Sequence, residues 1–281
     1  MKVITSFEVM FKSVMRARAC GKSIGFVPTM GALHDGHLSL LRRARRDNDL
    51  VVVSIFVNPA QFGKGEDFRK YPRRMNSDIA LCRKEKTDVV FCPGPEVIYP
   101  RGYKTFVSVE GLSGVLCGKY RPGHFRGVAT VVAKLLNITC PDIIYLGQKD
   151  IQQAVLISKM IKDLNFPVKV RVVPTVRERS GLALSSRNAY LSKQEKADAL
   201  VLSKSLKLAL ILIKGGLRDV KRIIKRMREL IDKKKNARIE YIAVVDRLNL
   251  EPLVKINSDC LIALAVRIGK TRLIDNISVQ I

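Results

Sequence analysis

Apolar and polar residues along the first 174 positions follow two alternating patterns. Leu50–Val57 is a continuous run rich in β-branched residues, which is typical of a strand buried on both faces. His37–Arg46 instead repeats its apolar residues at helical spacing. The patterns predict strands at Ile24–Pro28, Leu50–Val57, Val89–Cys92, Thr105–Val109, Ile143–Leu146 and Val168–Val173, and helices at His37–Arg46, Met75–Lys86, Arg126–Asn137 and Ile151–Leu164. This alternation predicts an α/β fold with a doubly wound parallel sheet, whose ligands bind beyond the carboxyl ends of the strands.

The N-terminal residues allow two interpretations. Lys12, Arg16 and Arg18 lie on an apolar-periodic stretch, a combination also found in transit peptides. The apolar positions recur at i, i+3, i+4 and i+7 and lead into the first predicted strand, and they are Phe7, Met10, Phe11 and Val14. We therefore expect a helix that belongs to the fold.

A different pattern begins after residue 174. Ser192 and Glu195 form a capping box that predicts the start of a long helix, and Gly215-Gly216 predicts its end near Lys214. A basic helix is expected next, followed by strands at Ile239–Val245, Leu261–Arg267 and Ile277–Ile281. We expect residues 1–174 to form the larger domain and residues 175–281 a smaller α+β domain.

Composition narrows the class of protein. Lys and Arg number 51 against 25 Asp and Glu, a net charge of +26, but basic residues occur throughout and the charge alone identifies no partner. Six cysteines without paired Cys/His spacing argue against a disulfide framework or a metal site, and favour a cytoplasmic location. No apolar run approaches the ~18–20 residues that a membrane span requires, so no membrane partner is expected.

The segment Gly25–His37 concentrates the candidate chemistry. A strand ends at Pro28, a turn of small residues follows, and a helix begins near Gly36. Backbone N–H groups at the start of a helix favour anions, so a phosphate chain is expected here. His34 and His37 can donate hydrogen bonds to phosphate oxygens as pyrophosphate leaves. The H-x-G-H pattern alone is equally compatible with a structural role, and its strand–turn–helix context is what favours a functional one.

Val27–His37, which reads VPTMGALHDGH, is followed by further segments in a fixed order. They are Val52–Phe62, Tyr71–Arg73, Arg121–Val128, Gly147–Gln153, Pro174–Arg177, Gly181–Asn188 and Thr271–Asn276. Together they resemble the pantothenate synthetase (pantoate–β-alanine ligase) family of the HxGH nucleotidyltransferase superfamily. The resemblance covers essentially the whole chain and implies a Rossmann-like nucleotide-binding domain.

The resemblance implies a reaction in two steps. ATP and (R)-pantoate would form pantoyl-adenylate and pyrophosphate, and β-alanine would then attack the activated carbonyl to give pantothenate and AMP. ATP, accompanied by Mg²⁺, is thus expected as a substrate together with pantoate and β-alanine. The family also implies a homodimer formed through the large domain. The Mg²⁺ ligands are not predicted.

The resemblance also implies which residues act. His34 and His37 would contact the phosphates, with His37 as proton donor, and Lys149 would neutralise charge on the α-phosphate. Leu184–Arg187 would be a mobile loop that clamps the β- and γ-phosphates through Arg187. The ATP-binding residues implied are Met30, Gly31, Ala32, Leu33, His34, Asp35, Gly36, His37, Gly147, Gln148, Lys149, Asp150, Val176, Leu184, Ser185, Ser186 and Arg187. Those implied for the other substrates are Gln61, for pantoate and β-alanine, and Gln153, for pantoate.

Several neighbouring residues have less specific expectations. Arg121 and His124 lie in a Gly/Pro turn, where they either brace the loop or face the substrate. Asn58 is expected to shape the turn before Pro59. Asp78 is a candidate for holding Mg²⁺, although a carboxylate on a helix surface is the plainer interpretation. The family commonly has Glu at the positions of two further residues, which are Cys117 and Gln148.

Two other functions compete with this one. Another HxGH adenylyltransferase would leave the nucleotide on its product, but Gln61, Gln153 and the second domain argue against it. A basic nucleic-acid-binding protein on the same fold would use the basic stretch Arg218–Lys235. Aromatic residues make up only 6% of the chain and Trp is absent, so base stacking has few platforms and no specific nucleic acid is expected.

Overall fold

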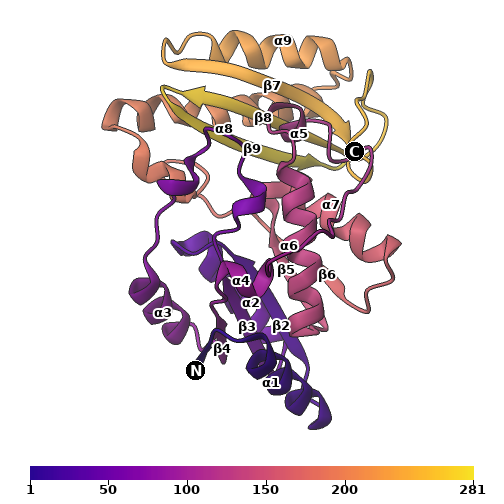
Figure 1. The fold of residues 1–281 in the computed structure, drawn as a ribbon. Coiled ribbons are helices and arrows are strands. Elements are labelled where there is room, and N and C mark those ends of the chain that lie inside the picture. The colour runs from indigo at the N-terminus through magenta and orange to yellow at the C-terminus, as the bar shows by residue number, and fades with distance from the viewer.

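Two sheets organise the chain, a parallel one and a smaller antiparallel one, and they lie at opposite ends of the molecule (Figure 1). The computed structural model describes residues 1–281. The parallel sheet consists of β1 (Lys2–Ile4), β2 (Ile24–Thr29), β3 (Leu50–Ile55), β4 (Val89–Phe91), β5 (Ile143–Gly147) and β6 (Lys169–Val173). The antiparallel sheet consists of β7 (Ala237–Asp246), β8 (Cys260–Ile268) and β9 (Thr271–Val279).

Helices lie on both faces of the parallel sheet, as the doubly wound prediction requires. Phe26 and Ile144 pack on one face beneath α1, α6 and α7, whereas Val27 and Tyr145 pack on the other with α2 and α3. The helices are α1 (Phe7–Ala19), α2 (Asp35–Asp47), α3 (Met75–Lys84), α4 (Pro95–Ile98), α5 (Cys117–Tyr120), α6 (His124–Thr139), α7 (Ile151–Asp163), α8 (Lys193–Lys214) and α9 (Val220–Ile231). Short 3-10 turns occupy Pro59–Gln61, Asp67–Arg69, Gln148–Asp150 and Ser186–Tyr190.

The order of strands in the parallel sheet is β1-β4-β3-β2-β5-β6. From β2 the chain builds outward through β3 and β4 on one side, and from β5 through β6 on the other. The order therefore reverses between β2 and β5, and the loops that follow these two strands diverge there. Such a crevice is where ligands bind in open α/β sheets.

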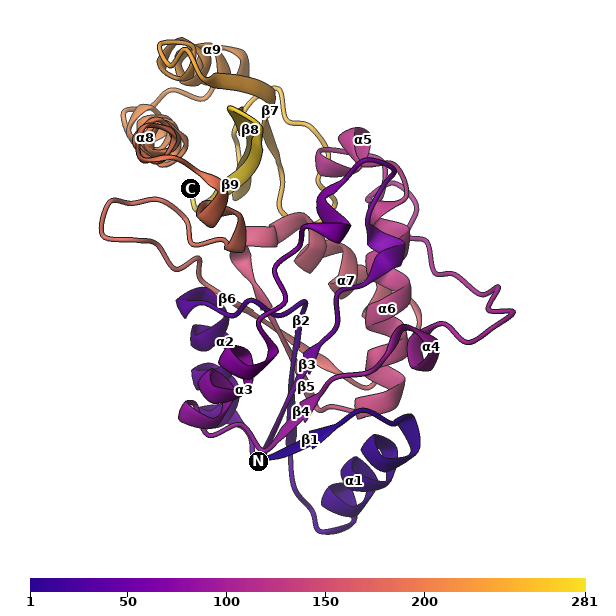
Figure 2. The ribbon, with the colours of Figure 1, turned by 60° about the vertical axis from the view of Figure 1, so that its left-hand side comes forward.

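Helices α8 and α9 cover one face of the antiparallel sheet (Figure 2). The capping box at Ser192 is present, because Ser192 Oγ accepts from Glu195 N at 3.2 Å while the Glu195 carboxylate accepts from Ser192 N at 2.8 Å. Gly215 caps the far end of α8, as predicted. The opposite face of this sheet is directed toward the parallel-sheet domain, since Val245, Leu261 and Ala263 join the apolar core beneath α6.

Some predicted elements are wrong. Residues 105–109 form no strand; Val107 N donates to Thr130 Oγ1 at 2.9 Å and no neighbouring strand pairs with the segment. The short edge strand β1 was not predicted, and the last strand spans Thr271–Val279 rather than Ile277–Ile281. The helix at Phe7 exists, but Phe7 and Phe11 are exposed, and only the other half of the predicted stripe is buried.

The division at residues 174 and 175 stays a prediction. The last strand of the parallel sheet ends at Val173, just before it. However, residues from β7 and β8 share the apolar core of the first part, so the two parts are packed together rather than joined only by a linker.

Candidate active site

The two imidazoles of the HDGH segment hold each other's backbone at the start of α2. His34 is the N-cap, and its Nδ1 accepts from Gly36 N at 3.1 Å, while His37 Nδ1 accepts from His34 N at 3.3 Å. A ring nitrogen that accepts from a backbone N–H carries no proton, so in the neutral rings the proton lies on Nε2. A Cβ at Gly36 would lie 2.8 Å from His34 Cε1, and this position therefore requires glycine.

Burial keeps these rings neutral. Burial first, and then the neighbouring His34, lower the pKa of His37 to about 3. The pKa of His34 is lowered by burial and by the charge of Lys149. The ring centroids are 4.2 Å apart, so both rings present Nε2–H donors without carrying a charge at neutral pH.

Asp78 fixes the turn that precedes these histidines. Its carboxylate accepts from Ala32 N at 2.9 Å and from Leu33 N at 2.8 Å. The prediction of a helix-surface carboxylate is wrong, because Asp78 is only 2% exposed. The turn needs this anchor, since Ala32 adopts a left-handed φ of 51° that costs energy for a residue with a side chain.

Sequence reasoning missed the role of Asp78, although a signal was present. Within α3 the buried residues are Asp78 and Cys82, one turn apart on the same face. A carboxylate at helical spacing from an apolar residue that packs inward is a candidate buried acceptor.

Gln61 lies in the loop after β3 and is 7% exposed. Its side-chain oxygen accepts from Asn58 Nδ2 at 3.0 Å, and its Nε2 donates to Met30 Sδ at 3.1 Å. Asn58 shapes the turn as expected, because its Oδ1 accepts from Ala60 N at 3.2 Å. Gln61 is thus oriented before any substrate binds.

Arg121 and His124 brace this loop. His124 Nδ1 donates to Gln61 O at 2.7 Å, and its Nε2 accepts from Arg121 Nη1 at 3.0 Å. Burial, followed by the charge of Arg121, lowers the pKa of His124 to about 4, which keeps this ring neutral. Arg121 forms a bidentate ion pair with Glu66 at 2.6 and 2.7 Å. Both residues also line the cavities described below.

The segment after β5 supplies a lysine and a carboxylate. Lys149 Nζ lies 3.5 Å from Asp150 Oδ1, and Asn276 Nδ2 donates to the carbonyl oxygens of Gln148 and Lys149, at 2.9 Å each. Burial by itself raises the pKa of Asp150, but the charges of Lys149 and Arg187 outweigh it, so the pKa is lowered and the group is ionised. A residue of β9 therefore fixes the backbone of this segment.

Gln153 lines the cavities, whereas its neighbour Gln152 has a structural role. The Gln152 side chain donates to Leu112 O at 3.0 Å and to Val115 O at 2.7 Å, and it accepts from Cys117 N at 2.9 Å. Cys117 is buried, with its Sγ 3.1 Å from Tyr241 Oη.

Arg187 is held by a carboxylate of the first domain. Its Nε and Nη2 donate to the two oxygens of Asp67 at 3.0 and 2.9 Å, which leaves Nη1 without a protein partner. Ser185 Oγ accepts from Arg187 N at 3.3 Å, and Ser186 Oγ lies 3.5 Å from Tyr71 Oη. This loop from the second part of the chain therefore closes over residues of the first.

These groups surround one cavity of about 210 Å³ at the reversal of strand order. Both imidazoles face Lys149 and the serine–arginine loop across it. The predicted site residues that line it are Met30, His34, Gly36, His37, Gln61, Gly147, Lys149, Asp150, Gln153, Val176, Leu184, Ser185, Ser186 and Arg187. Those that do not line it are Gly31, Ala32, Leu33, Asp35 and Gln148.

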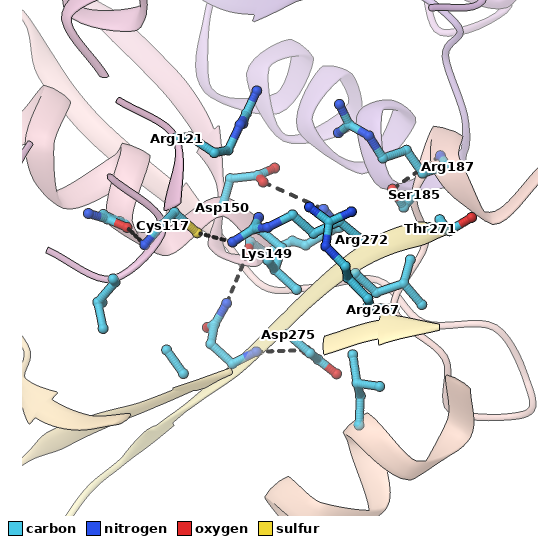
Figure 3. Close-up of a pocket in the computed structure, with 18 of the residues that line it drawn as sticks. Cys117, Arg121, Lys149, Asp150, Ser185, Arg187, Arg267, Thr271, Arg272 and Asp275 are labelled. Atoms are coloured by element: carbon cyan, nitrogen blue, oxygen red, sulfur yellow. Dashed lines mark hydrogen bonds and ion pairs between the residues drawn. The ribbon is translucent and has the colours of Figure 1, made fainter. Parts of the chain in front are cut away.

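A second cavity of about 420 Å³ adjoins the first, between the two sheets. The residues common to both include Lys149, Asp150, Ser185 and Arg187. Figure 3 shows its interior, where Lys149 and residues of the antiparallel sheet point toward one another. The two volumes together are in the range of small-molecule sites.

No group of three or more His, Cys, Asp or Glu side chains in the structure is arranged to hold a metal ion. Asp150 is the only carboxylate that lines both cavities, and its ion-pair partner is Lys149 rather than an arginine. Mg²⁺ needs only one or two protein carboxylates when phosphates supply its other ligands, so this donor set fits a metal that arrives with a nucleotide.

Comparison with known proteins gives concordant results. The model of the family described as Pantoate-beta-alanine ligase matches residues 2–278. A pantothenate synthetase of Heliobacterium modesticaldum is 54% identical over 281 residues, all of both chains. A solved pantothenate synthetase of Thermus thermophilus is 42% identical with a TM-score of 0.94, and 99% of each chain is covered. A pantoate-beta-alanine ligase of Francisella tularensis, complexed with "Beta-gamma ATP and Beta-alanine", is 37% identical with a TM-score of 0.82, covering 99% of this chain and 97% of that one.

Proposed function

The chain belongs to the pantoate–β-alanine ligase family, and from this premise we propose how its residues divide the reaction. The protein is an ATP-dependent ligase that condenses (R)-pantoate with β-alanine through pantoyl-adenylate, with release of AMP and pyrophosphate. The observation that carries the division of roles is the single cavity in which the two imidazoles face Lys149 and the Ser185–Arg187 loop.

In the first step a pantoate carboxylate oxygen attacks the α-phosphorus, and the bond to the bridging oxygen of pyrophosphate breaks. Negative charge builds up on that oxygen and on the equatorial oxygens. Lys149 stabilises this charge, and the Nε2–H groups of His34 and His37 donate to the phosphates. Because His37 stays neutral, it acts as proton donor through a hydrogen bond from its ring rather than as an imidazolium.

Pantoate is held in place by Gln61 and Gln153, which line the same cavity. Met30 and Asn58 fix the Gln61 amide, so its orientation is set in advance and binding immobilises few further bonds. In the second step the amine of β-alanine attacks the acyl carbon, AMP leaves, and the amine loses a proton. Gln61 serves both acids because they react at the same carbonyl.

Arg187 contributes its free Nη1 to the β- and γ-phosphates while Asp67 holds the other two nitrogens of the guanidinium. Val176 and Leu184 line the adenine end of the cavity. Asp150, the only carboxylate that lines the smaller cavity, binds either a ribose hydroxyl or Mg²⁺ beside Lys149. When bound, Mg²⁺ neutralises part of the polyphosphate charge.

Two properties of the whole protein extend this proposal. Phe7, Phe11 and Met15 form an exposed apolar row on α1, with the two Phe rings 5.8 Å apart, which supports a homodimer formed through the large domain. All six cysteines are free thiols, which supports a cytoplasmic location. No helix of the structure is long and apolar enough to span a bilayer.

A pyrophosphate-release assay with ATP and pantoate, with and without β-alanine, tests these roles. We expect wild type to form AMP and an amide product, and His37→Ala to lose about 10²–10³-fold in the adenylation rate, as for removal of one oxyanion donor. Arg46→Ala, at an exposed position of the same helix without an ion pair, is the matched control. Normal turnover by His37→Ala would falsify the role assigned to His37.

A further inference from the structure

The antiparallel sheet carries an unusual row of like charges. The strand register places Arg267 of β8 directly opposite Arg238 of β7 on one side and Arg272 of β9 on the other. Cross-strand partners have their Cβ atoms only about 4.5–5.5 Å apart, and like charges at such positions destabilise a sheet. An arginine row across all three strands therefore works against stability unless an anion compensates for it.

The protein compensates for the row only in part. Glu240 is the one carboxylate that pairs with it, through 2.8 Å to Arg267 Nε and 2.7 Å to Arg272 Nε. Arg238 has no ion-pair partner in the structure, nor does Lys270 in the turn between β8 and β9. Glu240 thus pairs with two of these four cations and leaves the other two without a carboxylate.

Two arginines of this row and the neighbouring Lys270 face the larger cavity. Arg267, Lys270 and Arg272 line it, and Figure 3 shows the first and last of these pointing toward Lys149. Arg272 is firmly placed, since its side chain is 16% exposed and Glu240 and Cys117 hold it. Arg267 is 46% exposed, and Glu240 holds it through Nε alone, so its Nη1 and Nη2 groups have no protein partner.

The carboxylates that line this cavity do not offset these cations. Glu66 is bound to Arg121, Asp67 to Arg187, and Asp275 to Arg177, each at hydrogen-bonding distance. Asp150 lies beside Lys149. The wall formed by the antiparallel sheet therefore keeps an excess of positive charge inside a concave space, which favours a small polyanion.

Pyrophosphate is the most highly charged product of the reaction, so it is the product that this excess of positive charge favours most. Lys149, Ser185 and Arg187 line both cavities, so pyrophosphate released between the histidines and Arg187 is formed beside the larger cavity. We propose that Arg267, Lys270 and Arg272 form a receiving site for inorganic pyrophosphate after it leaves the adenylation centre. The inference rests on the proposed function, because it takes the smaller cavity as the place where pyrophosphate is formed.

Such a site has a clear consequence for the reaction. Adenylate formation is reversible while pyrophosphate remains next to the acyl-adenylate. Moving the anion onto the arginine wall separates it from the reactive phosphorus and clears the cavity for β-alanine. The same three cations bind pyrophosphate that enters from solution. They therefore also set the affinity for pyrophosphate when adenylate formation runs in reverse.

ATP–pyrophosphate exchange in the presence of pantoate and the absence of β-alanine tests the proposal. The variant Arg267→Gln/Lys270→Gln leaves Arg272 in place, together with its contacts to Glu240 and Cys117. Lys233→Gln, at an exposed lysine beyond α9 without an ion pair, is the matched control. Loss of two charge-assisted contacts should raise the pyrophosphate concentration that gives half-maximal exchange about tenfold or more, with a much smaller rise in the KM for ATP.

The outcomes separate clearly. A half-saturating pyrophosphate concentration within twofold of wild type in the double variant would overturn the receiving site. So would an equal rise in the KM for ATP, because the wall would then contact intact ATP rather than the released product. Wild-type enzyme without any pantoate-dependent exchange would overturn the proposed roles in the smaller cavity, and the receiving site with them.

Discussion

Individual side chains in the site are fixed by backbone groups before any ligand binds. His34 and His37 each accept a hydrogen bond from a backbone N–H at the start of the helix through one ring nitrogen. The Asp78 carboxylate accepts from two backbone N–H groups in the preceding turn. These contacts set ring tautomers and turn geometry at once. Phosphate recognition is thereby left to Nε2–H groups in a fixed position, which is the preorganisation that transition-state stabilisation requires.

Replacement of Asp78 should reduce adenylation without removing any group that touches substrate. In Asp78→Asn, an amide NH₂ group replaces one of the two carboxylate oxygens that accept from the backbone N–H groups of the turn. The unsatisfied donor should lower the free energy of unfolding by about 1–3 kcal/mol. We expect at least a tenfold lower rate of pantoate-dependent pyrophosphate release. Asp219→Asn is the control, since Asp219 likewise accepts from a backbone N–H, of Arg222 at 2.8 Å, but caps α9 far from the site. Equal rates in both variants would contradict a positioning role for Asp78.

The pH dependence of adenylation should reflect the neutral rings. Burial lowers the pKa of His37 to about 3, so this ring gains no proton between pH 6 and 8, and burial also lowers the pKa of His34 below its ordinary value. The rate of ATP–pyrophosphate exchange should therefore show no inflection near 6.5, the ordinary pKa of histidine. Exchange measured from pH 5.5 to 8 checks this. An acid limb centred near 6.5 that disappears in His34→Gln would show that a charged ring had formed.

At the scale of elements, helix α6 packs closely against the loop after β3, and this contact fixes the position of Gln61. A Cβ at Gly127 would lie 2.2 Å from Ala60 O, and Gly127 O accepts from Asn58 Nδ2 at 3.1 Å. The helix therefore contacts the substrate loop through its own backbone, which only glycine permits. The sequence showed this glycine within Arg121–Val128, but not which loop it contacts.

Gly127→Ala should therefore act on pantoate binding. Moving the loop away from α6 shifts Gln61, so we expect the KM for pantoate to rise at least tenfold, with about 1–3 kcal/mol lost from the free energy of unfolding. Gly114→Ala is the control, since a Cβ there meets no atom within 4 Å. Steady-state kinetics and urea unfolding of both variants provide the measurements. A normal KM for pantoate in Gly127→Ala would show that this contact does not position the substrate.

At the scale of the whole molecule, contacts between the two sheets complete the site. Asn276 of β9 fixes the backbone of the Gln148–Lys149 segment, which follows β5. Arg187 and Asp67 join the same two parts from the other side of the cavity. The chemistry thus depends on how the antiparallel sheet sits on the parallel one, and not on either sheet alone.

Stability of the whole fold should fall as the solution becomes acidic. His37 and His124 have pKa values of about 3 and about 4 in the folded chain, below 6.5 for the unfolded one. Below pH 6.5 the unfolded chain binds more protons, so the free energy of unfolding decreases by up to about 1.4 kcal/mol per pH unit for each such histidine until the folded pKa is reached. Urea unfolding at pH 7.5, 6.5 and 5.5 measures the slope, and His124→Gln should make it shallower. Identical midpoints at all three pH values would contradict buried neutral rings.

The sequence alone determined the identity of most elements, and most of the site residues predicted from it line the cavity. Strand and helix periods, the capping box at Ser192 and the HDGH turn are local features, because they depend on residues within about four positions of one another. Where contacts join residues far apart in the chain, the tertiary structure decided. It buried Asp78 beneath the turn, left residues 105–109 without a partner strand, and aligned three arginines across β7, β8 and β9. Burial and cross-strand register are set by the packing of whole elements, and no local pattern encodes them.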